Sequence, residues 1–424
     1  MIFTTFKKIS SYNKLIAKEV SAQLIEKLIR ITIGLIVVKL ISNYLGPADF
    51  GNLNFIESFF TLILGISVFG MDVILVKKYL IHNDNSHKEK IFINGFILIF
   101  LCSLCTILFS IIIIKYFLNF KYESLLILLS ISIIVNPFSV IEYQLVSLNK
   151  IRHVSFLKTI SFVVSSFLKI AIIYYELPIK YFVFIIIVET ITFSILIYSF
   201  NFIKFKLSLI DINLIKGLFK EGAVIFLYGI GASLYSRIDI LMIQSLLPEN
   251  DLGYYSAAFK LYSFLLFIPG IIALSLFPRI ISENNIKSTF ISKSFKFSFY
   301  LGLIIFLFLF FSGDKIIEIL YGSEFNFSKG LFKVLILAYL ITSFSAVYIK
   351  LVYSKNLQNR LVYKIIIGLI LNIILNFLLI RKFGVYGAAY STILALFFLE
   401  FIYDFFDPKL REINILKLKS IFYK

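Results

Sequence analysis

The chain has 424 residues, of which 60% are hydrophobic and 16% are charged. Soluble domains average about 45–50% apolar and about 25% charged residues, so this composition indicates a protein that has lipid as its solvent. The net charge of +18 would suggest a nucleic-acid partner for a soluble protein. Basic residues also collect in the cytoplasmic loops of membrane proteins, and we therefore predict a lipid bilayer and no nucleic acid as the partner.

Long apolar segments predict the membrane-spanning helices, because a spanning helix needs roughly 20 mostly apolar residues. The segments without any Asp, Glu, Lys or Arg are 91–114, 124–141, 261–278, 297–313, 334–349, 365–380 and 383–399. The segments with isolated charges are 22–45, 50–76, 154–175, 181–203, 220–247 and 253–280, the last of which contains 261–278. The sequence therefore predicts an all-α polytopic membrane protein of about twelve transmembrane helices.

The connections between these segments alternate in basic charge. One set of alternate connections, which includes both termini, holds 28 Lys and Arg residues, and the other set holds 8. Because basic residues stay on the cytoplasmic side, both termini are predicted to be cytoplasmic in a multi-pass protein of the bacterial plasma (inner) membrane. The N-terminal segment has no apolar core followed by a small-residue cleavage site, so we expect no cleaved signal peptide.

A short motif occurs twice, about half the chain apart. Residues 45–51 read LGPADFG, and residues 247–253 read LPENDLG. Both place Asp, an apolar residue and Gly in a short outward loop that opens the next helix. Six helices separate the two copies, which predicts an N-terminal six-helix bundle at 1–210 and a C-terminal one at 211–424. Parallel repeats of this kind occur in transporters, where the substrate is handled between the halves.

Charged residues inside the predicted helices form the candidate site. A charge at the bilayer centre costs roughly 2.5–3.5 kcal/mol on insertion scales, so such residues are functional candidates by default. Lys and Arg that face an internal cavity favour an anion such as phosphate. The candidate phosphate-binding residues are Arg30, Lys169, Arg237 and Lys260, and the candidate coupling or counter-charge residues are Glu57, Glu189 and Asp239. For the deeper charges, the alternative is a structural ion pair between neighbouring helices.

Other charged and metal-ligating residues have simpler interpretations. Lys27, Asp72 and Asp404 lie within about two turns of the predicted cytoplasmic ends, where long side chains can reach the interface. Cys102 and Cys105 form a C-x-x-C pattern, but it lies inside an apolar segment, whereas a reactive thiol needs polar surroundings. The histidines form no ligand cluster. We therefore predict no metal site, no cofactor and no catalytic residue.

Three segments resemble the polysaccharide-biosynthesis, or O-antigen, flippases of the multidrug/oligosaccharidyl-lipid/polysaccharide exporter superfamily. The segments are 38–80, with LGPADFG at 45–51 and FGMD at 69–72; 236–280, with RID at 237–239, LGYYSAA at 252–258 and a later FPR; and 371–393, with LN near Asn376 and GVYGAA at 384–389. Their order along the chain is that of the family. The resemblance covers nearly the whole chain, although each motif alone is loose.

The resemblance implies a fold of two six-helix bundles around a central cavity. It also implies transfer of an undecaprenyl-diphosphate-linked oligosaccharide from the inner to the outer leaflet of the plasma membrane. Family substrates include O-antigen units of lipopolysaccharide, capsule and related glycans, so the resemblance does not name the glycan. It implies the lipid-linked oligosaccharide as a partner, and other glycan-assembly membrane proteins as further candidate partners.

Two alternatives remain beside this interpretation. A multidrug exporter of the same superfamily would need a cavity of carboxylates and aromatic rings, and the candidate cations argue against that. A membrane glycan polymerase would need a sizeable outward domain, whereas the longest outward connection, about 312–333, is short. The sequence also shows no paired carboxylates, nucleotide loop or Ser-His arrangement in a common region. We therefore predict a transporter rather than an enzyme.

Overall fold

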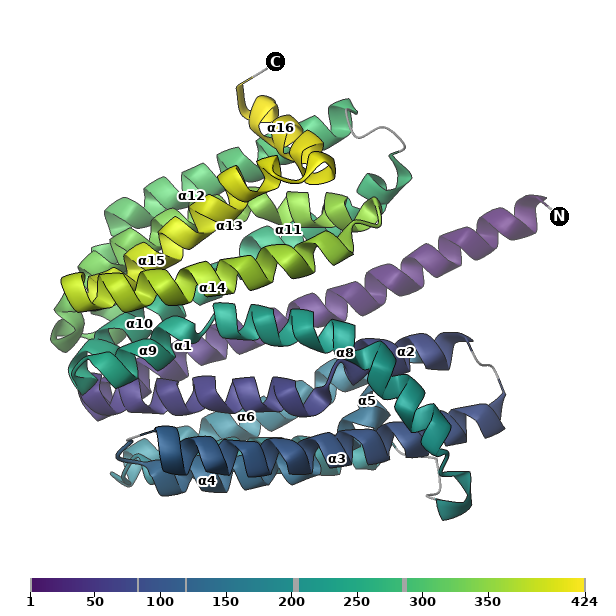
Figure 1. The fold of residues 1–424 in the computed structure, drawn as a ribbon, viewed down its shortest axis with the longest axis horizontal. Helices are drawn as coiled ribbons and strands as arrows, with labels where there is room; N and C mark the ends of the chain where they lie inside the picture. Colours follow the sequence, from purple (N-terminus) through teal and green to yellow (C-terminus); the bar gives the residue numbers. More distant parts are fainter. Residues whose placement is uncertain (1, 82–83, 119, 201–205, 284–287, 423–424) are drawn as a thin grey trace. The chain divides into compact units, whose positions relative to one another are not determined.

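A computed structural model of the chain is helical throughout its described residues, which contain no strand (Figure 1). The described residues are 2–81, 84–118, 120–200, 206–283 and 288–422. Side chains are not described for residues 2–24, 117, 278, 421 and 422. The predicted all-α class is confirmed.

The first eight helices end at Tyr235. They are α1 (Ile2–Val68), α2 (Met71–Ile81), α3 (Asn85–Phe117), α4 (Glu123–Ile131), α5 (Ser139–Ser147), α6 (Ile151–Tyr174), α7 (Lys180–Tyr198) and α8 (Ile212–Tyr235). Short 3₁₀ segments lie at Ser132–Phe138 and Leu207–Leu209.

The remaining helices follow after Arg237. They are α9 (Ile238–Leu246), α10 (Glu249–Leu265), α11 (Phe267–Ser282), α12 (Thr289–Tyr321), α13 (Asn326–Ser354), α14 (Gln358–Phe383), α15 (Val385–Phe397) and α16 (Pro408–Phe422). A π-turn lies at Phe398–Ile402, and 3₁₀ turns lie at Ser323–Phe325 and Tyr403–Phe405.

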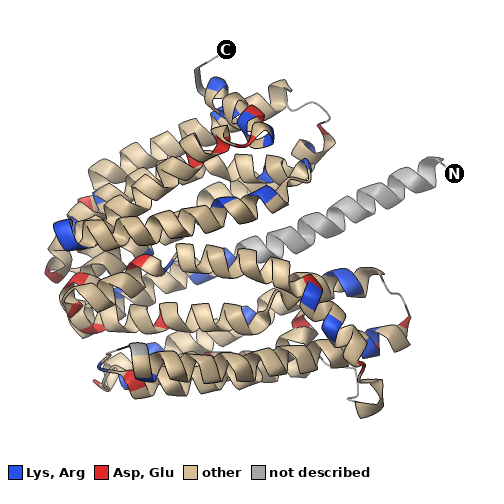
Figure 2. Ribbon diagram, viewed as in Figure 1, with Lys and Arg blue, Asp and Glu red and all other residues tan. Residues whose placement is uncertain are grey.

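Ten helical stretches of the described residues are long and apolar enough to cross a membrane, by length and composition. The longest, Ile25–Ile81, is divided at Gly46, where the backbone leaves the helical region, and so covers two predicted helices. Helix α12 holds the predicted apolar segment 297–313 as well. The prediction of about twelve spanning helices is therefore confirmed. Figure 2 shows that Lys and Arg gather toward helix ends and leave long uncharged stretches between them.

Several predicted helices are broken where the sequence analysis expected continuous ones. Segment 50–76 is interrupted at Phe69 and Gly70, whose φ angles of 51° and 71° are left-handed. Segment 124–141 tightens into a 3₁₀ stretch that contains Pro137. Proline removes a backbone donor and clashes with the preceding turn, which explains that break. At Gly70 the cause is tertiary, because a Cβ there would lie 2.9 Å from the carbonyl oxygen of Gly222 on α8.

The chain packs as two compact units. Unit 1 comprises residues up to Tyr44 together with Phe59–Ile230, and unit 2 comprises Leu45–Ser58 together with Gly231–Lys424. In unit 1, α6 packs against α7, and α3 packs against α4. In unit 2, α13 packs against α10, α11, α12 and α15, and α14 packs against α15 (Figure 1).

The predicted bundle boundaries, 1–210 and 211–424, rest on the sequence repeat rather than on packing, and they stay a prediction. By packing, most of α8 belongs to unit 1, and residues 45–58 of α1 belong to unit 2.

The two copies of the repeated motif meet within unit 2. Gly46 and Pro47 stand where α1 breaks, and Pro248 directly precedes α10. A Cβ on Gly253 would lie 1.9 Å from the carbonyl oxygen of Pro47, and one on Gly51 would lie 2.5 Å from the amide nitrogen of Gly253. Neither Gly51 nor Gly253 has a positive φ. Both glycines therefore permit a close approach of two helices, and neither is required by a left-handed backbone conformation.

We expect Gly253→Ala to reduce the amount of folded protein in the membrane to a small fraction of the wild type. The added methyl group has no room beside the Pro47 carbonyl, and the contact is with backbone, which cannot swing aside. Gly270→Ala on α11 is the matched control, because a Cβ there meets nothing within 4 Å. Membrane abundance and a monodisperse detergent extract measure the effect. Equal abundance of the two variants would contradict the close-approach explanation.

Candidate functional site

A group of polar residues in unit 2 contains three of the candidate site residues. It consists of Asn54, Glu57 and Ser58 on α1, Arg237 before α9 and Lys260 on α10, and we call it the Glu57 cluster. The Lys260 ammonium donates to Asn54 Oδ1 at 2.9 Å and to Glu57 Oε2 at 3.0 Å. It also lies 5.7 Å from the centre of the Phe50 ring. The structure therefore brings the predicted cation Lys260 and the predicted counter-charge Glu57 together.

Arg237 is placed by the break between α8 and α9, where it occupies the N-cap position of α9. Its guanidinium Nη1 donates to the Ser58 hydroxyl at 3.1 Å. Among the described residues no carboxylate lies within 4.0 Å of the guanidinium, although Glu57 is near enough to act on it electrostatically. An arginine offers five N–H donors in a planar fork, so most of them remain available to an oxyanion.

Asp239 lies two residues further along and is buried among neutral donors. Its carboxylate accepts hydrogen bonds from the Tyr255 hydroxyl at 2.7 Å, Asn376 Nδ2 at 2.7 Å and the Thr392 hydroxyl at 2.6 Å. Within the described part of the chain it has no ion pair with Lys260 or Arg237. Three hydrogen bonds offset much of the cost of burying the carboxylate, and they join α9 to α10, α14 and α15.

In unit 1, one face of α6 gathers the other candidate residues. Positions 158, 162, 165 and 169 are spaced three or four residues apart, so they share a helix face. Arg30 Nη2 donates to the Lys158 carbonyl at 2.7 Å, and its guanidinium lies 5.0 Å from the Phe162 ring centre. Ser165 donates to Glu189 Oε2 at 2.7 Å. Arg30 also pairs with Glu26, at 2.9 Å between Nε and Oε1.

Lys169, at the end of this face, is half-buried. Its ammonium has no hydrogen bond or ion pair with any residue that the structure describes, and Glu189 is not within 4.0 Å of it. The structural ion pair that the sequence left open for these two residues is therefore not formed. Along this face of α6, Arg30 of α1 has a carboxylate partner, and Lys169 has none among the described residues.

Four buried charges that were not predicted to meet form a group near the C-terminus, which we call the C-terminal charge cluster. It consists of Lys364 on α14, Glu400 in the π-turn, Asp404 in the 3₁₀ turn that follows, and Lys417 on α16. The Lys364 ammonium pairs with Glu400 Oε1 and Asp404 Oδ1, each at 3.1 Å. The Lys417 ammonium, which is 0% exposed, donates to the Glu400 carbonyl at 2.7 Å and pairs with Glu400 Oε2 at 3.3 Å.

A sequence signal for Lys417 did exist. The positions 410, 413, 414, 417 and 420 are all buried, and their spacing is that of one helix face. Lys417 therefore lies on the packed side of α16, where Leu410 and Ile413 are its apolar neighbours. This also corrects the interpretation of Asp404, which is fully buried and paired rather than extended toward the interface.

Two carboxylates cap the helices α3 and α8 outside the spanning segments. Asp84 accepts from the Ser86 hydroxyl at 2.5 Å and from His87 Nδ1 at 3.1 Å, and these hydrogen bonds lower the pKa of Asp84 to about 2. Asp211 accepts from the Lys90 ammonium at 2.7 Å and from the amides of Asn213 and Leu214, which hold the pKa of Asp211 below its usual value. Both caps therefore remain ionised at neutral pH.

Comparison with known sequences and structures agrees with this architecture. The sequence profile of the polysaccharide biosynthesis protein family matches residues 16–284. A curated relative, the probable low-salt glycan biosynthesis flippase Agl15 of Haloferax volcanii, is 25% identical over 219 residues, which are 49% of this chain and 46% of the relative. The match thus spans about half the length of that relative.

Solved structures with the same fold are distant in sequence. The lipid II flippase MurJ, in an inward closed conformation, is similar with a TM-score of 0.76 at 16% identity, covering 96% of this chain and 91% of that one. An inward-facing multidrug resistance MATE family transporter of the MOP superfamily has a TM-score of 0.71 at 14% identity, covering 94% and 99%. These likenesses show the transporter fold of that superfamily. Because the family profile matches more than half of the sequence, the chain belongs to the polysaccharide biosynthesis protein family.

Proposed function

We propose that the protein is a flippase that moves an undecaprenyl-diphosphate-linked oligosaccharide from the inner to the outer leaflet of the bacterial plasma membrane. The observation that carries this proposal is the pair of half-buried cations without a carboxylate partner, Lys169 in unit 1 and Arg237 in unit 2. Lys169 lies in a helical stretch that is long and apolar enough to span the membrane, and Arg237 lies in the predicted spanning segment 220–247, at the break between α8 and α9. An uncompensated charge in the hydrocarbon region costs a few kcal/mol. A diphosphate head group would supply the missing negative charge.

The other candidate residues have complementary roles in this proposal. Arg30 and Lys260 form ion pairs with Glu26 and Glu57. When the substrate binds, each cation can exchange its carboxylate partner for a phosphate, so the cation is not left unpaired at any point. Glu57, Glu189 and Asp239 are the proposed counter-charge or coupling groups. The glycan would be an O-antigen, capsule or related unit, and its assembly enzymes in the membrane are the proposed partners.

A multidrug exporter of the same superfamily is the remaining alternative, because the fold alone is common to MATE transporters and MurJ. The charge of the site favours the flippase. Anionic lipid diphosphates suit unpaired cations, whereas cationic drugs would be repelled by Arg237 and Lys169.

The test uses a strain that lacks its own copy of the gene. The wild-type chain should restore display of surface glycan, and the lipid-linked precursor that accumulates without it should fall to normal levels. The same cells should show no change in their sensitivity to cationic dyes and drugs. Restored drug resistance without glycan display would overturn the flippase assignment in favour of the exporter.

Topology offers an independent check of the proposed location. We expect reporter fusions at Lys78, Arg152, Lys206, Lys293 and Arg360, and at the C-terminus, to report the cytoplasm, because basic residues concentrate in these connections. Fusions at outward connections, for example after residue 250 and after residue 322, are the matched controls and should report the opposite side. An outward signal at the C-terminus would contradict an even number of spans.

A further inference from the structure

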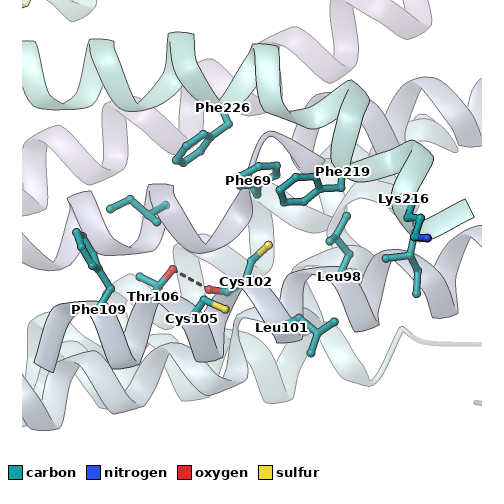
Figure 3. Close-up of a pocket in the computed structure, with 12 residues that line it drawn as sticks. Phe69, Leu98, Leu101, Cys102, Cys105, Thr106, Phe109, Lys216, Phe219 and Phe226 are labelled. Carbon is teal, nitrogen blue, oxygen red and sulfur yellow. Dashed lines mark hydrogen bonds between the residues drawn. The ribbon is translucent and has the colours of Figure 1, made fainter. Parts of the chain in front are cut away.

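Unit 1 holds an apolar groove that the site described above does not use. Its volume is 670 Å³, and it lies between the end of the α1 segment, α3 and α8. Leu98, Cys102 and Phe109 on α3 form one wall, and Phe219 and Phe226 on α8 form the opposite one. Figure 3 shows Lys216 at one end of the groove and Phe109 at the other.

Stacked aromatic rings give the groove a flat and fixed wall. The Phe69 ring stacks on Phe219 and on Phe226, with ring centres 4.6 Å apart in both pairs. Phe69 holds a left-handed φ of 51°, which is strained for a residue with a side chain. Close packing of the following Gly70 against Gly222 maintains that conformation. The backbone break between α1 and α2 therefore fixes the position of Phe69 in this wall.

The polar groups of the groove are nearly all satisfied within the protein. The Thr106 hydroxyl donates to the Cys102 carbonyl at 2.7 Å, so it offers no donor to a ligand. Some basic residues of the same unit are paired: Lys78, Lys90 and Lys206 pair with Glu221, Asp211 and Glu89. Lys216 is exposed and has no such partner among the residues that the structure describes, and the same holds for Lys220 one turn away. Of these two lysines, only Lys216 lines the groove.

We propose that this groove binds the isoprenoid chain of a polyprenyl phosphate or diphosphate, with the phosphate at Lys216 and the chain along α3 toward Phe109. The assignment rests on the proposed flippase function for the identity of the lipid. The unpaired ammonium matches an anionic group at the mouth of an otherwise apolar groove. A polyprenyl lipid attaches one hydrocarbon chain to its phosphate, whereas a phospholipid places two chains beside it, and this groove is a single apolar channel with one ammonium at its end.

The length of the groove fits one leaflet. From Leu98 to Phe109, α3 advances about 16 Å at 1.5 Å per residue, which is roughly half of the hydrocarbon core of a bilayer. Lys216 lies in the second turn of α8, ahead of the predicted spanning segment 220–247 and therefore on its predicted cytoplasmic side. On α3 the groove begins in the cytoplasmic half of the predicted span 91–114 and continues past its middle. It can therefore hold the first part of the chain while the diphosphate lies on the cytoplasmic side, where the proposed substrate begins.

The test is photolabelling of the full-length protein in vesicles of phosphatidylethanolamine and phosphatidylglycerol. The probe is undecaprenyl diphosphate with a diazirine on an isoprene unit near the phosphate. We expect adducts on residues 98–109, and excess unlabelled undecaprenyl diphosphate should remove them. Cys105→Trp fills the groove and should abolish the adducts, and Leu101→Trp is a second filling variant in case the first fails to fold. Lys216→Gln should weaken the competition about tenfold.

Matched controls lie on the same helices. Leu108 on α3 is 64% exposed outside the groove, and Lys220 on α8 lies one turn from Lys216 outside it. Leu108→Trp and Lys220→Gln should label as the wild type does. Competition by phosphatidylglycerol equal to that by undecaprenyl diphosphate, or equal loss in the controls, would overturn the assignment. Glycan display by the same strains separates the two proposals: display without specific labelling refutes the groove alone, and specific labelling without display refutes the flippase alone.

Discussion

Arg237→Ala is expected to abolish glycan display while the protein remains in the membrane at its wild-type amount. Arg237 lies beside α9 with a single hydrogen bond to the Ser58 hydroxyl. Its removal costs the fold little, because hydrogen bonds of this kind contribute about 1 kcal/mol. A substrate diphosphate would lose several charge-assisted hydrogen bonds at once. Arg237→Lys should impair transport more than Lys260→Arg does, because lysine cannot offer the planar fork.

The readouts are surface glycan in a strain without its own copy of the gene and membrane abundance measured in parallel. Arg381→Ala on α14 is the matched control, since this arginine stacks on Phe377, with 3.8 Å from its Cζ to the ring centre, and belongs to a predicted outward connection. Full glycan display from an Arg30→Ala, Arg237→Ala double variant would refute the assignment of both arginines to the substrate site.

Removing Lys260 alone, and then together with Glu57, distinguishes a structural role of Lys260 from a role in substrate binding. Lys260→Ala leaves Glu57 half-buried without its partner at 3.0 Å, so a drop in abundance is expected from the ion pair alone. Lys260→Ala with Glu57→Ala removes both charges and should restore abundance. A purely structural pair predicts that transport returns with abundance, whereas a substrate-binding Lys260 predicts that transport stays lost.

The helices could be predicted from the sequence because burial in lipid imposes one simple demand, a run of about 20 apolar residues. Segments such as 91–114 and 365–380 lie inside α3 and α14 as expected. The breaks could not all be predicted. Pro137 is visible in the sequence and indicates a break in its helix, where the structure has a 3₁₀ stretch. The break at Gly70 depends on close packing against Gly222, which is distant in the sequence. Contacts of that kind are visible only once the helices are packed.

The same distinction applies to the candidate site: the unusual residues could be predicted from the sequence, but their contacts could not. Charges within apolar segments mark Lys260 and Glu57 as unusual, and their pairing across distant parts of the chain emerges only from the fold. The sequence could not show that Lys169 and Glu189 stay apart, because both lie in helices that pack against each other. Lys417 was counted among the cytoplasmic basic residues because it is one of several Lys and Arg residues after position 407, and the helical spacing that it shares with Leu410 and Ile413 was not used.

Lys417→Met is expected to destabilise the protein strongly, although it replaces a charged residue with an apolar one inside the protein. The C-terminal charge cluster holds two cations and two carboxylates, so its net charge is zero. The variant leaves Glu400 and Asp404 to share Lys364, and Glu400 loses two of its contacts. Removing one partner of a buried ion pair costs about 3–5 kcal/mol. The thermal midpoint in detergent should fall on the order of 10 °C.

Two comparisons make this result specific to the buried charge. Lys419→Met changes an exposed lysine on the same helix and should leave the midpoint unchanged. Adding Glu400→Gln to Lys417→Met restores a neutral cluster, with Lys364 and Asp404 still paired at 3.1 Å, and should recover much of the loss. Recovery follows only if charge imbalance, rather than lost packing around α16, causes the instability. If the Lys417→Met protein were as stable as the Lys419→Met protein, the ammonium of Lys417 would not contribute to holding α16 in place. The remaining charges of the cluster would then be stable without it.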